Sequence, residues 1–171
     1  EAGEALRVLG AHAVPLPVAE TMAANRLLAA AGLPLAEGAA SLTRADGLII
    51  ESGRLTGLVE RVAWADHLDC LAIAAGDKLY RIPRAGWTIA ATGEALNFQP
   101  RQTIMVDCEA AISATLPHCP LAEGATVRAY QIAGALEAAL DLTLLHTSTR
   151  VQFGKPLAKN QVVQHELAKL A

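Results

Sequence analysis

The sequence lacks a long uninterrupted run of apolar residues, although 53% of its 171 residues are hydrophobic. The apolar stretch from Ile132 to Leu145 is interrupted by the acidic residues Glu137 and Asp141. A membrane-spanning helix needs about 20 consecutive, predominantly apolar residues. The sequence therefore predicts no membrane span.

An excess of positive charge is also absent. The chain has 14 lysine and arginine residues against 17 acidic residues, and its net charge is -3. The basic residues are scattered, so they form no stripe that would neutralise phosphates or an anionic membrane surface. Nucleic acid is therefore not an expected partner.

Cysteine is scarce, and its spacing shows no pairing. The three cysteines, Cys70, Cys108 and Cys119, form no CxxC pair, and the first residues show no basic region followed by an apolar core. This pattern favours reduced thiols, as in the cytoplasm, and we expect the three cysteines to be packing residues. His67 and His118 lie near two of them in sequence, but neither group has the paired spacing of a zinc site, so no metal is expected.

The pattern of apolar and turn residues changes twice along the sequence, from one typical of helices to one typical of strands and back to one typical of helices. A short helical segment within residues 1–13 precedes a helix over about 18–31, which Pro17 begins and Gly32 ends. Between about 43 and 117, short apolar segments alternate with glycine, proline and aspartate. Such segments are typical of antiparallel strands joined by hairpins.

Beyond the strands, apolar residues recur every four positions from Ile132 to Leu144 and predict a long helix that ends near Arg150. Gly154 and Pro156 then predict a corner before a second helix. Two helices joined by a tight corner pack as an antiparallel hairpin. The expected fold class is therefore α+β.

The corner carries the most specific motif of the sequence. It reads Arg150-Val151-Gln152-Phe153-Gly154-Lys155-Pro156-Leu157, followed by Gln161, Val163, Gln164 and Leu167-Ala168. This run resembles the pattern that acyl-CoA dehydrogenases carry in a helix hairpin after a β domain. Two further stretches, residues 15–21 and 132–136, resemble segments of that family's N-terminal and C-terminal helical domains.

The resemblance implies a multidomain α+β architecture. Residues 1–40 would be the end of an N-terminal helical domain, 41–119 a middle antiparallel β-barrel or β-sandwich domain, and 120–171 the start of a C-terminal four-helix bundle. The helix over 164–171 contains no Gly, Asn or Pro that would end it, and the first residue is not Met. We therefore expect the sequence to be part of a longer polypeptide.

The residues of the corner suit a flavin adenine dinucleotide (FAD). Arg150 offers a rigid fork of donors for a pyrophosphate, Gln152 and Gln161 can bond to ribose, adenine or phosphate, and Phe153 offers a flat apolar face. By resemblance, these four residues are cofactor contacts and reach FAD bound mainly by a neighbouring subunit of a dimer or tetramer. The alternative is structural, because an arginine at a helix end and a phenylalanine in a helix corner are common devices.

Two motifs by which the family holds the flavin ring are not intact. Ser41–Asp46 is at best a remnant of the first, and Trp64 stands in the place of the tryptophan of the second. Ala65 and Asp66 follow where the polar flavin contacts would be. Trp64 would back the flavin ring or, as is more common for a tryptophan in a strand, belong to the core.

The resemblance implies removal of the α-proton of an acyl-CoA by a glutamate and transfer of the β-hydrogen to FAD, with electrons passed to an electron-transferring flavoprotein. We assign no catalytic residue: Glu123 is the nearest carboxylate to one family position, but it is about one residue out of register, and the base of most branches lies beyond residue 171. A non-catalytic, flavin-poor partner subunit of a heteromeric dehydrogenase is the main alternative. An acyl-CoA oxidase remains a third.

Overall fold

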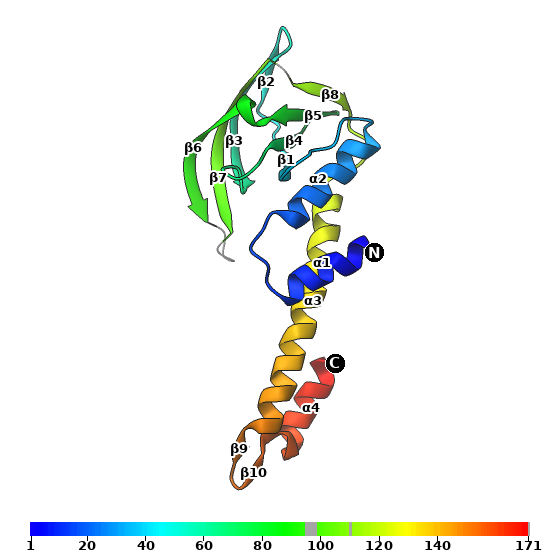
Figure 1. Cartoon of the computed structure of the whole chain (residues 1–171), viewed down its shortest axis with the longest axis vertical. Coiled ribbons are helices and arrows are strands. Elements are labelled where there is room, and N and C mark those ends of the chain that lie inside the picture. The colour runs from blue at the N-terminus through cyan, green and yellow to red at the C-terminus, as the bar shows by residue number, and fades with distance from the viewer. Residues whose placement is uncertain (95–98, 110, 171) are drawn as a thin grey trace. The chain divides into compact units, whose positions relative to one another are not determined.

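The computed structural model describes residues 1–94, 99–109 and 111–170, and its elements follow the order helices, strands, helices (Figure 1). The α+β class expected from the sequence is therefore present. The chain forms two compact units. One comprises Pro15–Val127, and the other comprises Glu1–Val14 together with Arg128–Ala171.

Two four-stranded sheets, one whole helix and the beginning of another helix make up the unit Pro15–Val127. Strand order in the first sheet is β1-β4-β5-β8, and in the second it is β2-β3-β7-β6. The first sheet consists of β1 (Ala40–Arg44), β4 (Cys70–Ala75), β5 (Lys78–Pro83) and β8 (Ile112–Thr115). The second consists of β2 (Ile49–Glu51), β3 (Arg54–Ala63), β7 (Pro100–Cys108) and β6 (Trp87–Glu94), with the 3-10 turn η1 (Arg84–Gly86) before β6.

Side chains from both sheets form the larger core cluster. Ile73 and Ile82 of the first sheet pack with Val59, Trp87 and Ile104 of the second, and all five are almost completely buried. Strand residues of alternating direction supply these side chains, as expected for a sheet with one buried face. The two sheets therefore form a sandwich.

The helix α2 (Val18–Ala30) covers the other face of the first sheet (Figure 1). Its residues Leu27 and Leu28 are fully buried against Ala72 and Leu79. Because α2 and the second sheet lie on opposite faces of the first sheet, β4 is buried on both sides, which explains its continuous apolar sequence.

The strand arrangement corrects two details of the expected β domain. We expected antiparallel strands throughout, but β1 pairs with β4 in parallel, from Ala40 beside Cys70 to Arg44 beside Ala74. The hairpin of β2 and β3 lies between these strands in sequence and belongs to the other sheet, so the chain returns to β4 in the direction of β1. The pairings among the described residues form two sheets and show no closed barrel.

The cysteines differ from the expectation that all three are packing residues. Cys70 and Cys108 are buried, whereas Cys119 is exposed, and all three are free thiols. Burial raises the pKa of the Cys70 thiol. The prediction is therefore correct for two cysteines and wrong for Cys119, which lies at the surface directly before Pro120.

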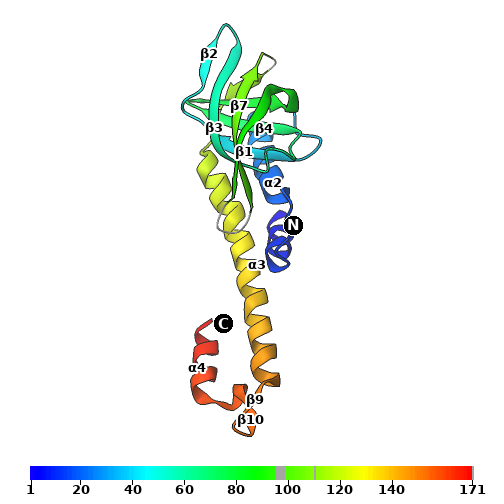
Figure 2. The same ribbon diagram turned by 90° about the vertical axis from the view of Figure 1, so that its left-hand side faces the viewer.

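The second unit is helical. It contains α1 (Ala2–Ala11), the C-terminal part of α3 (Pro120–Thr149), and α4 (Gln161–Leu170). Between α3 and α4 lie the short strands β9 (Val151–Gln152) and β10 (Lys155–Pro156) and the 3-10 turn η2 (Leu157–Lys159), after which the chain reverses direction (Figure 2). No helix in the part of the chain that the structure describes is long and apolar enough to cross a membrane.

Candidate cofactor-binding site

The corner motif forms a β-hairpin rather than a simple helix corner. Arg150 follows the last residue of α3, and its backbone carbonyl accepts a hydrogen bond from the Leu157 amide at 2.9 Å. Within this frame Gln152 pairs with Lys155 across the two short strands. Arg150, Gln152 and the apex of the turn therefore belong to one short hairpin, and the side chains at all three positions are exposed.

Phe153 lies at the apex in a strained backbone conformation. Its φ is +52° and that of Gly154 is +76°, the positive values that a two-residue type I′ turn requires at both positions. For a bulky residue such as phenylalanine this region is rare and costs about 1–3 kcal/mol. The side chain is 99% exposed, so it does not plug the corner as the structural alternative requires.

Gln161, the fourth predicted contact, is the first residue of α4 and lies at one end of an open groove. The groove has a volume of about 580 Å³ and is lined by Gln161, Val162, Gln164, His165, Glu166 and Ala168. All of these residues belong to α4, so the groove is an open surface along one helix. Sequence reasoning assigned no role to His165, although its position four residues after Gln161 puts both side chains on one face of the helix.

The segment from Trp64 to Asp66, which stands where the resemblance places contacts to the flavin ring, is packed against its own β domain. Trp64 is only 8% exposed and belongs to the core cluster between the sheets, and Ala65 is completely buried. The buried side chain of Gln102 on β7 accepts a hydrogen bond from the Ala65 amide and donates one to the Asp66 carboxylate, both at 2.9 Å. The residues that resemble flavin contacts are therefore engaged with the domain itself.

The turn that begins at Trp64 also has an unfavourable backbone. The φ of Trp64 is +61°, and Arg61 in the preceding β-bulge has a φ of +57°. Each such residue costs about 1–3 kcal/mol and persists only where its surroundings hold it in place. The buried indole nitrogen of Trp64 also has no hydrogen-bond partner within the described ranges.

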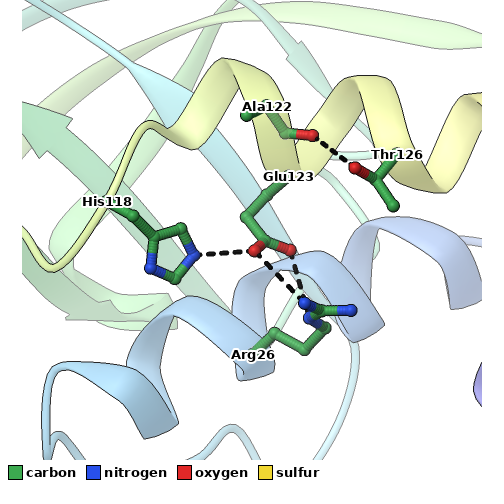
Figure 3. Close-up of polar contacts among 5 residues, drawn as sticks. All are labelled: Arg26, His118, Ala122, Glu123 and Thr126. Carbon is green, nitrogen blue, oxygen red and sulfur yellow. Dashed lines mark hydrogen bonds and ion pairs between the residues drawn. The ribbon is translucent and has the colours of Figure 1, made fainter.

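The buried carboxylate of Glu123 contacts two side chains that are more exposed, which Figure 3 shows. Its Oε1 lies 2.6 Å from the His118 Nε2 and its Oε2 lies 3.2 Å from the Arg26 Nε. Glu123 is 6% exposed, whereas the Arg26 side chain is 61% exposed. A carboxylate with two such partners connects the start of α3 to α2 and is poorly placed to accept a proton from a substrate. No group of three metal-ligating side chains occurs in the described parts of the chain.

Comparison with known proteins agrees with the motif. Residues 118–171 match the C-terminal domain of acyl-CoA dehydrogenases. The acyl-CoA dehydrogenase IpdE2 of Mycobacterium tuberculosis is 30% identical over 176 residues, which cover 99% of this chain and 51% of that protein. The chain thus spans about half the length of this relative.

Solved structures share the fold. The steroid ACAD variant Tcur3481-Tcur3483 superposes with a TM-score of 0.75 at 22% identity, covering 95% of this chain and 54% of that one. The ChsE4-ChsE5 complex of Mycobacterium tuberculosis superposes with a TM-score of 0.74 at 19% identity, covering 96% and 54%. At these identities the likeness concerns the fold alone.

The order of helices, sandwich and helices is the fold of these solved structures. The sequence matches identify the family: the chain belongs to the acyl-CoA dehydrogenases.

Proposed function

We propose that the chain is part of an FAD-dependent acyl-CoA dehydrogenase, which introduces a double bond between Cα and Cβ of an acyl-CoA thioester. Electrons would pass to an electron-transferring flavoprotein, and the protein would act in the cytoplasm. The observation that carries this proposal is the exposed hairpin after α3, where Arg150, Gln152 and Phe153 of the family motif stand together.

Each hairpin residue has a part in holding the cofactor. The Arg150 guanidinium would donate paired hydrogen bonds to the pyrophosphate, and the Gln152 and Gln161 amides would bond to ribose or adenine. Phe153 would cover an apolar face. A bound flavin supplies an acceptor for the β-hydrogen, while the α-proton goes to a carboxylate. Glu123 is not proposed for that role, because its carboxylate is buried beside His118 and Arg26.

The proposal includes an oligomer. A strained turn that leaves a phenylalanine 99% exposed is unfavourable for an isolated chain, and such strain is typical of functional contacts. We propose that Phe153 and Arg150 reach FAD held by a neighbouring subunit. That subunit would be a second copy or a related chain, in a dimer or tetramer.

A second candidate is a non-catalytic, flavin-poor partner subunit of a heteromeric acyl-CoA dehydrogenase. The observation that favours it is the burial of Trp64 and Ala65, which leaves no aromatic face for a flavin ring at that turn. The exposed hairpin suits both candidates, because either subunit would offer Arg150 to its neighbour. An acyl-CoA oxidase would share the same contacts and differ in the access of oxygen to the flavin.

The experiment is a comparison of flavin content in the purified full-length protein, expressed alone and with any neighbouring dehydrogenase-like subunit. The variant Arg150→Ala should lose flavin absorbance from the oligomer, whereas Lys159→Ala, which removes an exposed cation from η2, should retain it. Unchanged flavin content in Arg150→Ala would refute the cofactor assignment.

The same preparation separates the candidates. Protein that is yellow when expressed alone and bleaches on addition of an acyl-CoA is a catalytic dehydrogenase or oxidase subunit. Protein that is colourless alone, and yellow only with its partner, is the flavin-poor subunit.

A further inference from the structure

A buried amide side chain holds the turn that follows β3. Gln102 of β7 is 1% exposed, and both of its polar atoms are used within this one turn. Its Oε1 accepts a hydrogen bond from the Ala65 amide at 2.9 Å, and its Nε2 donates to Asp66 Oδ1 at 2.9 Å. A glutamine amide can accept a hydrogen bond at its oxygen and donate one from its nitrogen. The two neighbours of Gln102 therefore need an amide at this position, and not only a side chain of the same volume.

A second side chain holds the same residue from β6. The indole nitrogen of Trp87 donates a hydrogen bond to the Ala65 carbonyl at 3.2 Å. Both backbone groups of Ala65 are therefore bonded to side chains of the second sheet, and Ala65 itself is fully buried. The turn is fixed to the sheet on two sides.

The conformation held in this way is not favourable by itself. Trp64 has a left-handed backbone, and its buried indole nitrogen has no partner in the described part of the chain. Strained conformations persist only where neighbouring contacts over-determine them. Without the hydrogen bonds from Gln102, we expect the turn to relax to a favourable backbone conformation and the Trp64 ring to leave the core.

We propose that Gln102 is a positioning residue that keeps the Trp64–Asp66 turn closed, with the Trp64 ring in the core, so that this β domain offers no aromatic face to a flavin ring. The inference rests on the proposed function and favours its second candidate, the flavin-poor subunit, because Trp64 stands where the resemblance places the tryptophan beside the flavin. A flavin contacted by the Arg150 hairpin is then held by the β domain of a related chain and not by that of a second copy.

Tryptophan fluorescence of the full-length protein tests the closed turn. The difference between the spectra of the parent and of Trp64→Phe isolates the emission of Trp64. In Gln102→Glu, the introduced carboxylate still accepts from Ala65 but faces the Asp66 carboxylate without a proton to donate. We expect the Trp64 emission to shift to longer wavelength and to become more accessible to acrylamide.

The double variant Gln102→Glu/Asp66→Asn restores a donor opposite the acceptor, so it should return the parental emission. A folded single variant with unchanged Trp64 emission would overturn the role of Gln102. So would a folded double variant that keeps the shifted emission, because a merely apolar role in packing predicts no rescue by this exchange.

The consequence for flavin is tested by adding FAD to the parent protein purified without a partner. A closed turn predicts no saturable quenching of the Trp64 emission, whereas saturable quenching, with flavin retained on the protein, would overturn the inference. Failure of the proposed function has a different signature. In that case the Arg150→Ala oligomer would retain its flavin, while the Trp64 emission of the parent and of the Gln102 variants would still follow the expectations above.

Discussion

Arg7 of α1 and Glu137 of α3 form an ion pair at 2.5 Å, although 130 residues separate them in sequence. The two helices approach closely beside this pair. A side chain at Gly134 would overlap the Arg7 backbone, and one at Gly10 would overlap the Gln131 backbone. The absence of two Cβ atoms therefore allows α1 to pack on α3, as Figure 2 shows.

Replacing Gly134 with alanine should separate α1 from α3, because the overlapping atom is backbone and cannot rotate away. We expect the free energy of unfolding to fall by about 1–3 kcal/mol, the usual cost of overpacking. Gly124 on the same helix is the matched control: a Cβ there meets nothing within 4 Å, and Gly124→Ala should be neutral or stabilising by up to about 1 kcal/mol. Equal stability of the two variants in urea would contradict the close packing.

Phe153→Asn tests whether the strained turn serves the cofactor. Asparagine tolerates a positive φ, so the free energy of unfolding of the variant should rise by up to about 1 kcal/mol. The oligomer should nevertheless retain less flavin. Ser52→Asn is the control, because Ser52 has a φ of +50° at the equivalent position of the β2–β3 turn. It should be stabilised without loss of flavin. If both variants retain the parental flavin content, Phe153 is not a cofactor contact.

Glu123→Ala should impair stability more than chemistry. It leaves His118 and Arg26 without their carboxylate, and we expect a loss of about 1–3 kcal/mol in the free energy of unfolding, with turnover per folded flavin site largely retained. Glu37→Ala, at an exposed loop position, should change neither quantity. A fall in turnover by about a hundredfold or more at unchanged stability would instead identify Glu123 as a general base.

Much of the secondary structure could be predicted because its signals are local. Pro17 and Gly32 enclose α2, and the apolar segments between turn residues correspond to strands β2 to β8. The period of four after Pro120 corresponds to α3. The family motif was equally readable, since its residues are consecutive in sequence and lie in one hairpin. That these residues contact FAD is still a prediction.

The sequence by itself determined the order of the elements, the corner motif and the family, because periodicity, turn residues and consecutive motif positions need no knowledge of distant contacts. Only the tertiary structure decided that β1 runs parallel to β4, that Trp64 points into the core, and that Glu123 is paired with His118 and Arg26. Each of these depends on residues far apart along the chain. The bonds from Gln102 to a turn 36 residues earlier show the reason: strand pairing brings the partner of a strained turn into place, and no local pattern records it.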